Sequence, residues 1–505
     1  MYIKKSRAFI RGKTYEYLRL VQGVRVGSKV IHKVVAYLGR TDDPTSAASF
    51  LFNKAPVQDA KQQARLYGLP MACNQIIEKV LDLPALFSRV LPASTPANTF
   101  LLIKLMILSR IINPESKLSL TRWYHHLYLP EQLPKTIDVH KFYDALDCLL
   151  IHKETIEKLL YEKLRDQNLV DTTMVFYDLT SSYFEGESCE MAAYGHSRDK
   201  RSDLLQITLG LVIDKSGLPI YHEVFEGNML DKKTVKGILD KVKTTLAIKN
   251  ILFVADKGML SPDNIEHLEQ LAKDGYTYIL SQSPRTGYAQ FREYLLKKDA
   301  WTALSDTLHY TATDKGVLCY NPQTAKKAKH TRDEKLAKCI TFIATEEAKA
   351  TKDKRAQSKD TIHDRIVRKL HTSHASKYFD PKDNFKKKEE IITKEELLDG
   401  VFVLTGNTSL APDEMIKAYK QEAIIEHSFR IIKDVVELRP IYHYNSNRVK
   451  AHVFLCVLSY LVAALLERKT GKTIKMLKEK YMTSVIVNGD TPTSPKKIIG
   501  EGIDF

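Results

Sequence analysis

The chain has 505 residues, enough for about two to four domains, and its 44% hydrophobic content is that of an ordinary globular protein. Its 77 Lys and Arg residues against 61 Asp and Glu residues leave a formal net charge of +16, which favours a polyanionic partner. Six scattered cysteines without a CxxC pair argue against a disulfide framework or zinc ribbon and indicate a reducing compartment. The longest apolar stretch, Val453 to Leu466, is shorter than the roughly 20 residues that span a bilayer, so we expect a buried helix and no membrane association.

Residues 1–45 are predicted to form a basic β-hairpin arm. Strand-forming runs from Thr14 to Val21 and from Lys29 to Leu38 flank Gly23 and Gly27, which mark the turn. The many Lys and Arg residues of this segment fit a solvated, charged edge and a DNA-contacting arm equally well.

Residues 46–170 are predicted to be helical, because apolar residues recur at helical spacing in Phe100–Leu108 and again from Phe142 onward. Several short helices beside basic residues fit a helix-turn-helix DNA reader. A plain helical packing region fits at least as well, because no recognition helix can be singled out.

From residue 171 to residue 284 the pattern becomes α/β. Three strands come first, followed by alternating helix and strand, which is the order of a ribonuclease H-like core. The first strand carries Asp178 after the apolar run Met174–Tyr177, and a later strand, Ile251–Ala255, ends at Asp256. A helix is predicted to begin at Ser261, with a hydroxyl suited to the N-cap and Pro262 after it.

Residues 285–400 interrupt this order and are predicted to be an insertion with short β-like stretches, such as Cys339–Ile343. Its clustered lysines fit a solvated excursion or a positively charged wall beside the site. The core is then expected to resume over residues 401–440, followed by a C-terminal helical region over residues 441–505.

A periodic helix is predicted from Glu414 to Val436. At about 100° per residue, four of its polar side chains fall within roughly 60° of one another. These are Tyr419, Glu426, Arg430 and Lys433. A neighbouring apolar stripe would anchor the helix on the sheet; it consists of Ala418, Ile425, Phe429, Ile432 and Val436. The simplest alternative is a surface stripe with an i,i+4 pair between Glu426 and Arg430.

Asp178, Asp256 and Glu426 are the candidate catalytic and metal-binding residues. A carboxylate at the end of a hydrophobic strand is costly to bury unless it is paired or binds a metal. Two strand acids and one helix acid on a basic chain therefore suggest metal-dependent phosphoryl transfer on nucleic acid.

The sequence resembles the DDE transposases of bacterial insertion sequences, in the group with a β-rich insertion before the third acid. Four passages carry the resemblance: Phe176–Ser181, Gly195–Gln206, Phe225–Asn228 and Ala255–Ser261. Around the third acid the family has Tyr, two residues, Arg, three residues, Glu, six residues and Lys. Tyr419, Glu426 and Lys433 match this pattern, whereas Glu422 occupies the Arg position, so Lys420 or Arg430 would have to supply that cation.

The resemblance implies that three carboxylates hold two divalent ions, Mg²⁺ or Mn²⁺, and that one site cleaves transposon ends and joins them to target DNA. Tyr419, Lys433, Arg430 and Lys420 would contact DNA, and the family usually acts as a homodimer. Together with the absence of a signal peptide in Met1–Lys5, this indicates a bacterial cytoplasmic, nucleoid-associated protein. The alternatives are a ribonuclease H-like nuclease without strand transfer and a catalytically inactive DNA-binding protein.

Overall fold

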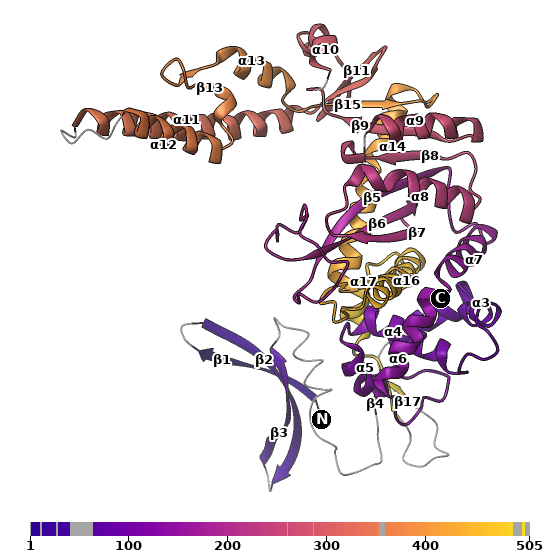
Figure 1. The fold of residues 1–505 in the computed structure, drawn as a ribbon. Helices are drawn as coiled ribbons and strands as arrows, with labels where there is room; N and C mark the ends of the chain where they lie inside the picture. The colour runs from indigo at the N-terminus through magenta and orange to yellow at the C-terminus, as the bar shows by residue number, and fades with distance from the viewer. Residues whose placement is uncertain are drawn as a thin grey trace. The chain divides into compact units, whose positions relative to one another are not determined.

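The computed structural model describes residues 2–10, 13–26, 29–40, 64–259, 261–285, 287–352, 359–487 and 497–499 (Figure 1). The chain divides into two compact units. The first unit comprises Met1–Asp171, Leu179–Met229 and Ile425–Phe505, and the second comprises Thr172–Asp178 and Leu230–Ile424. The six segments expected from the sequence stay a prediction.

The N-terminal segment forms a three-stranded antiparallel sheet in the order β1-β2-β3. Its strands are β1 (Tyr2–Ile10), β2 (Lys13–Val26) and β3 (Lys29–Arg40). The predicted pairing of the second and third strands is confirmed, but Gly23 does not mark the turn, and Gly27, the other glycine expected there, lies outside the described residues. Gly23 pairs with His32 inside the ladder, and the last pair is Val26 with Lys29. The strand β1 was not expected.

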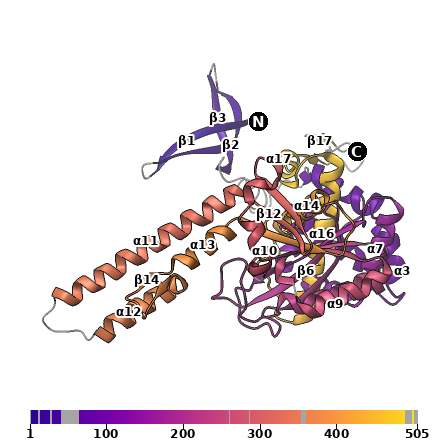
Figure 2. The ribbon, with the colours of Figure 1, turned by 90° about the horizontal axis from the view of Figure 1, so that it is seen from above.

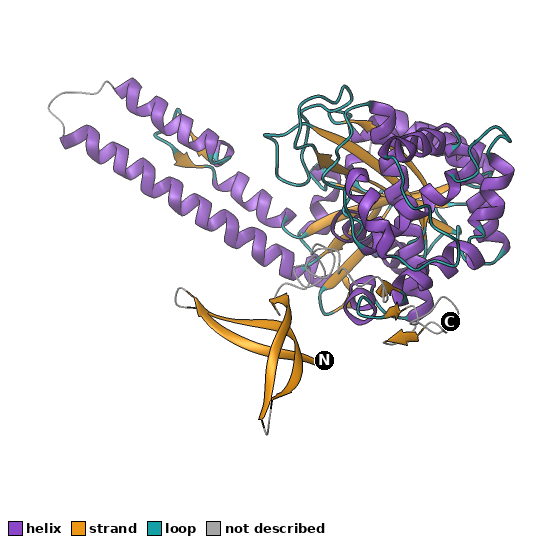
Figure 3. Ribbon diagram, turned by 90° about the horizontal axis from the view of Figure 1, so that it is seen from below, coloured by secondary structure: helices purple, strands orange, loops and turns teal. Residues whose placement is uncertain are grey.

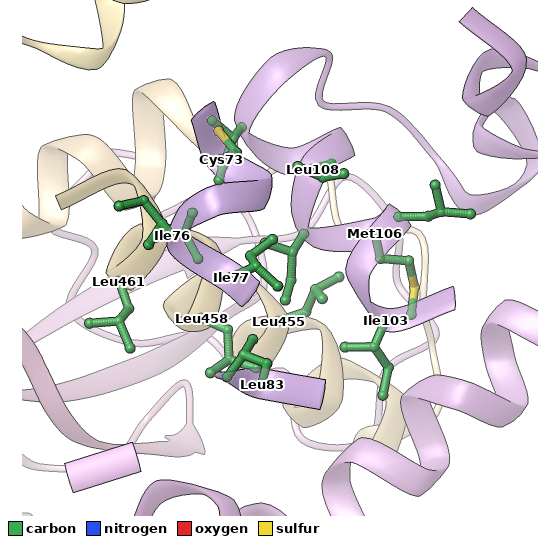
Figure 4. Close-up of a cluster of buried hydrophobic side chains, with 14 of the residues drawn as sticks. Cys73, Ile76, Ile77, Leu83, Ile103, Met106, Leu108, Leu455, Leu458 and Leu461 are labelled. Atoms are coloured by element: carbon green, nitrogen blue, oxygen red, sulfur yellow. The ribbon is translucent and has the colours of Figure 1, made fainter. Parts of the chain in front are cut away.

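The rest of the first unit has a helical core, as predicted for this region, although residues 46–63 lie outside the described residues. Its early elements are β4 (Ala64–Leu66), α2 (Gly68–Gln75), η1 (Ile76–Val80), α3 (Leu83–Val90), α4 (Thr99–Ile112), α5 (Lys117–Trp123), η2 (Tyr124–His126), α6 (Val139–Ile151) and α7 (Lys153–Asp166). The C-terminal α16 (Ser446–Thr470) packs against α4 and α6, and α17 (Ile474–Tyr481) packs against α2. Figure 4 shows how Leu455, Leu458 and Leu461 of α16 meet apolar residues from η1 and α4.

The predicted buried helix over Val453–Leu466 is confirmed as part of α16. By length and composition α16 could cross a membrane, but 89% of its most apolar window is buried inside the protein. It therefore serves as the central helix of the core.

In the second unit the strands run in the order β10-β11-β12-β15-β9-β8-β5. Their bounds are β5 (Met174–Tyr183), β8 (Leu252–Ala255), β9 (Thr277–Gln282), β10 (Thr302–Ser305), β11 (Leu308–Thr313), β12 (Gly316–Tyr320) and β15 (Val401–Gly406). β5, β8 and β9 are parallel, whereas β15 joins β9 antiparallel, so the sheet is mixed. The helix α8 (Asp231–Thr245) leads into β8, and α9 (Pro262–Leu271) connects β8 to β9. The predicted N-cap is confirmed, because Ser261 accepts from the backbone N–H of Asn264.

β5 passes from the second unit to the first after Asp178. In the first unit its order continues through β6 (Gln206–Asp214) to β7 (Pro219–Glu226), which pair antiparallel. Asp214 holds the turn between them, since its carboxylate accepts from the backbone N–H groups of Ser216 (3.0 Å) and Leu218 (2.8 Å). The chain order of three strands followed by helix, strand, helix and strand confirms the ribonuclease H-like core.

The expectation of a β-rich insertion is wrong for most of its length. β10, β11 and β12 extend the sheet, but the following residues form α11 (Pro322–Lys352), α12 (Lys359–Thr372) and α13 (Glu389–Leu398) (Figures 2 and 3). A short antiparallel pair, β13 (Phe379–Asp380) and β14 (Lys386–Lys387), lies between α12 and α13. Cys339–Ile343 is helical, because Leu336, Cys339 and Ile343 lie one turn apart and pack against residues of α12.

The predicted continuous helix from Glu414 to Val436 is also wrong. The chain forms α14 (Pro412–Lys420), α15 (Ala423–Arg430) and the π-helical turn η7 (Ile431–Val435). At the break, the N–H groups of Gln421, Glu422 and Ile424 bond carbonyls three residues earlier, which is tighter than an α-helix. The apolar stripe is nevertheless buried as predicted, with Ile425, Ile432 and Val436 at 0% exposure.

Candidate active site

Two of the three predicted acids lie on neighbouring parallel strands of the second unit. Phe176 of β5 pairs with Val254 of β8. Continuing this register by two residues places Asp178 opposite Asp256. Neighbouring strands are about 4.8 Å apart, so the two carboxylates project from adjacent backbone positions.

Both acids follow the last parallel pair of β5 and β8, Phe176 with Val254, although β5 itself continues to Tyr183. Asp178 is partly exposed, although Tyr177 and Leu179 beside it in the chain are buried. Asp256 follows the last residue of β8 and is also partly exposed. The carboxyl ends of parallel strands are the usual ligand sites of open α/β sheets.

Tyr419 of α14 lies near this pair of acids, within the same unit. Its side chain hydrogen-bonds with Ser281 of β9 and with Glu422, and the negative charges of Glu422 and Asp256 both act on it. Burial, reinforced by these charges, raises the pKa of Tyr419 well above its usual range. Tyr419 therefore stays protonated at neutral pH and can donate a hydrogen bond beside Asp256.

The departure from the family pattern at Glu422 has a structural consequence. Where the family has a cation, this chain has a carboxylate that binds the Tyr419 hydroxyl. Lys420, one of the two candidates for the missing cation, is exposed on α14, and its positive charge acts on Cys319 of β12. These contacts place an extra acid, and not an extra cation, beside Tyr419.

The third predicted acid belongs to the first unit, whereas the other two belong to the second. Glu426 is exposed in the first turn of α15, and Arg430 is exposed near its end. The i,i+4 ion pair between them is not formed in the part of the chain that the structure describes. The single face proposed for Tyr419, Glu426, Arg430 and Lys433 is lost, because the helix breaks between Tyr419 and Glu426.

Lys433 pairs with the carboxylate of Asp199, a residue far from it in the sequence. Asp199, in the loop between β5 and β6, accepts from Lys433 Nζ (2.8 Å) and from Arg439 Nη1 (3.3 Å). Burial lowers the pKa of Lys433, and the Asp199 charge opposes this shift. Asp203 of the same loop pairs with Arg201 instead, at 2.7 Å.

The loop that carries Asp199 is anchored to β5. The backbone N–H of Arg198 donates to the Ser181 hydroxyl (2.8 Å), and the guanidinium of Arg439 lies 4.2 Å from the centre of the Tyr183 ring. Arg439 is a residue of this cluster that sequence analysis missed. Its position six residues after Lys433 was the only available signal.

Two of the sequence passages that carry the family resemblance meet in the first unit. Gln206 Nε2 donates to the carbonyl oxygens of Gly227 (2.9 Å) and His196 (3.2 Å). A Cβ added at Gly195 would overlap the Gly227 carbonyl, and one added at Gly227 would overlap the Gln206 carbonyl. Glycine is therefore required at both positions for the backbones to approach this closely.

The donor chemistry of the two strand acids fits a hard divalent cation, which prefers carboxylate oxygens. Within the described ranges, no group of three or more His, Cys, Asp or Glu side chains is gathered that could hold a metal ion. The second unit thus supplies two neighbouring carboxylates, and a third protein ligand would have to be a residue that is not gathered with them in this structure.

Comparisons with known proteins agree with this chemistry. Residues 169–462 match the family model described as "Transposase DDE domain", and residues 3–61 match "IS1634 family transposase, N-terminal domain". No curated protein sequence matched the chain.

Two solved structures show limited similarity. One is a piggyBac transposase synaptic complex with hairpin DNA, at 10% identity over 82% of this chain and 79% of that chain, with a TM-score of 0.38. The other is a Mos1 transposase paired-end complex with the left transposon end, at 11% identity over 37% of this chain and 60% of that chain, with a TM-score of 0.16. The family matches decide the assignment, because the DDE-domain match covers more than half of the chain. This chain belongs to the DDE-domain transposases of insertion sequences.

Proposed function

We propose that Asp178, Asp256 and Glu426 are the catalytic acids with which this transposase cuts transposon ends and joins them to target DNA. Membership of the family makes the protein a DNA transposase that depends on divalent metal ions. The single observation that supports the assignment of the two strand acids is the parallel register of β5 and β8, which would set Asp178 opposite Asp256 if continued two residues beyond the last pair, Phe176 with Val254.

In this proposal the three acids bind two ions, Mg²⁺ or Mn²⁺. When bound, these ions would activate the attacking water or DNA 3′-hydroxyl and stabilise the leaving oxygen. The carboxylates of Asp178 and Asp256 supply oxygen ligands from fixed strand positions, and Glu426 supplies one from the exposed first turn of α15.

In this proposal Tyr419 and the cations Lys420, Arg430 and Lys433 position the DNA. Tyr419 exchanges its hydrogen bond to Glu422 for one to a phosphate oxygen, while Lys433, Arg430 and Lys420 neutralise phosphate charge. Because Lys433 is already paired with Asp199, its role is to offer a charge in a fixed place. Phosphoryl transfer depends mainly on such positioning and charge neutralisation.

We further propose that the protein acts as a homodimer on a pair of transposon ends and a target duplex, in the nucleoid of the bacterial cytoplasm. The family usually bridges two ends in this way. Light scattering of the protein with and without end DNA tests this proposal, and one protomer per pair of ends would contradict it.

The test of the catalytic assignment compares Asp178→Asn, Asp256→Asn and Glu426→Gln with the wild type. Labelled end DNA is incubated with each variant and Mg²⁺ or Mn²⁺, and nicked and joined products are scored beside gel-shift binding. Each variant is expected to lose cleavage and joining together, by about 10³-fold or more, because losing the metal removes both of its contributions. End binding and the unfolding temperature should stay near the wild type, and double variants should be no worse than single ones.

Glu422→Gln is the matched control for Glu426→Gln, because both residues are glutamates of the same segment. If Glu422→Gln abolishes cleavage while Glu426→Gln does not, Glu422 is the third ligand and the assignment of Glu426 is wrong. Joined products from the wild type would exclude a nuclease without strand transfer. Metal-dependent cleavage would exclude an inactive DNA-binding protein.

A further inference from the structure

The first unit contains a polar cavity of about 360 Å³ that the proposed chemistry does not use. Arg110 from the end of α4 and Lys117 from the start of α5 line it. Tyr442, His443 and His452, which follow the third-acid segment in the chain, line it as well. The cavity therefore joins the helical region to the segment just beyond Glu426.

Arg110 and Lys117 are buried cations without a carboxylate partner. Their exposed fractions are 4% and 6%. Arg110 donates to the backbone carbonyls of Glu115 and Glu437, and neither it nor Lys117 forms an ion pair with any described residue. Burying a charge without a counter-charge is costly, so a bound anion would stabilise this arrangement.

The histidines beside these cations are fixed in place but carry no compensating charge. His452 Nε2–H donates to the Leu438 carbonyl (3.1 Å), which leaves Nδ1 to accept from Lys117 Nζ (2.9 Å). His443 packs edge-on against the ring of Tyr143 at 5.7 Å. Its Nε2 is buried without a hydrogen-bond partner in the described part of the chain, so the described residues leave this polar atom unsatisfied.

Burial is the main cause of the lowered pKa values of these groups, and neighbouring positive charges add to it. Burial, with the charge of Arg110 added, lowers the pKa of Lys117 to about 7. Burial and the charges of Lys117, Arg448 and Arg110 lower the pKa of His443 to about 3. The acid that lines the cavity is Glu115, whose carboxylate accepts from the Ser119 hydroxyl. Arg448 is already paired with Asp147 at 2.9 Å.

Aromatic residues complete the cavity and its surroundings. Tyr143 and Tyr442 line it, and Tyr442 is 65% exposed, while Tyr444, two residues on, is 73% exposed. Exposed aromatic rings beside cations are the usual platform for unpaired nucleotides, since the base stacks on the ring and the cations hold the phosphate. The volume lies within the ~300–1,000 Å³ range of small-ligand pockets, and a duplex is far too large to enter it.

We propose that this cavity binds a nucleoside phosphate, supplied by one unpaired nucleotide of the DNA substrate. Arg110, Lys117 and His443 face the phosphate, and Tyr143 and Tyr442 face the base. This inference rests on the proposed function for its DNA source, but it concerns a second site that contains none of the catalytic acids. A frayed or nicked end would place a nucleotide there during the reaction.

Direct binding without divalent metal tests this proposal, because no cleavage then contributes. Fluorescence anisotropy of a labelled single strand of about ten nucleotides is measured for the wild type, Lys117→Met and Tyr442→Ala. A matched control, Lys158→Met, removes an exposed lysine of α7. Each pocket variant is expected to weaken single-strand binding by about tenfold, the effect of losing one charged hydrogen bond or one stacked base, while the control is unchanged.

Competition identifies the source of the phosphate. Deoxynucleoside monophosphate should displace the strand from the wild type, inorganic phosphate should do so more weakly, and duplex binding should be equal in all variants. Monophosphate binding tighter than strand binding would overturn DNA as the source. Because Tyr442 is exposed, Tyr442→Ala should fold even if Lys117→Met does not. Equal single-strand affinity for wild type and Tyr442→Ala would overturn the site, whatever the catalytic variants do.

Discussion

Lys433 is a positioned cation, held by Asp199 at 2.8 Å with its side chain only 12% exposed. Arg439 shares the same carboxylate. A cation held in this way loses little further freedom when a phosphate binds, so it contributes more to orientation than a mobile surface lysine. The residue that decides how Lys433 acts is therefore Asp199.

Asp199→Asn should slow end cleavage by about 10–100-fold without weakening end binding, because small errors in the position of Lys433 cost rate more than affinity. Lys433→Ala, in contrast, should reduce both. Asp203→Asn is the control, since Asp203 pairs with Arg201 on the exposed side of the same loop. The measurements are single-turnover cleavage and gel shift with the same end DNA. Wild-type cleavage by Asp199→Asn would show that the ion pair does not position Lys433 for the reaction.

Lys117 provides a pH-dependent prediction. Its pKa is about 7 in the folded protein, against an ordinary lysine value of 10.5 in the unfolded chain, so between these values the unfolded state binds more protons. Lys117 should therefore make the free energy of unfolding increase with pH across this window. Burying Lys117 should cost most below pH 7, where the residue is charged in both states. The difference in unfolding temperature, Lys117→Met minus wild type, should be larger at pH 6 than at pH 9.5. Each kcal/mol of difference corresponds to about 2–4 °C. A difference independent of pH would contradict the lowered pKa.

At the scale of elements, the first unit depends on the close approach of β6, β7 and the loop before β6. Gln206 bonds across this junction to His196 and Gly227, and Gly195 leaves no room for a side chain. The loop that this junction fixes is the one that carries Asp199. The close backbone packing at these two glycines therefore fixes the loop whose Asp199 pairs with Lys433.

Gly227→Ala should destabilise the protein strongly, by at least about 2 kcal/mol, since its Cβ would overlap the Gln206 carbonyl and the backbone must move. Gly237→Ala is the control: a Cβ there meets no atom within 4 Å, and alanine favours the helix α8 by up to about 1 kcal/mol. Denaturant unfolding and limited proteolysis of the loop at residues 195–206 measure both effects. Equal stability of the two variants would show that the junction can relax.

At the scale of the whole molecule, the chain passes between the two units four times, and the proposed acids lie close to two of these passages. Asp178 is the last residue of its segment, and Glu426 is the second residue of another. The proposed triad therefore draws on both units. A chain that must combine them on a DNA end is expected to use its overall positive charge for the first encounter.

End binding should accordingly be steeply salt-dependent. With a net charge of +16, the slope of log affinity against log salt should be about −0.9 for each duplex phosphate that the protein neutralises. Titrations between about 50 mM and 200 mM salt, with the metal-free Asp256→Asn variant to prevent cleavage, measure this slope. The result that would exclude DNA as the main electrostatic partner is a slope near zero.

The sequence by itself determined the elements whose signals are local. The strand that carries Asp178, the strand that precedes Asp256, the N-cap at Ser261 and the buried stretch of α16 were correctly predicted, because each depends on neighbouring residues in the chain. Short-range periodicity and capping describe one element at a time.

Only the tertiary structure decided the remaining features. Cys339–Ile343 has strand-like composition but is helical, because its apolar side chains are buried against α12. The helix over Glu414–Val436 breaks at residues 421–422, although its apolar period continues across the break. The pairing of Asp199 with Lys433 joins residues that are 234 positions apart. Contacts between distant segments depend on how the whole chain packs, which no local pattern contains.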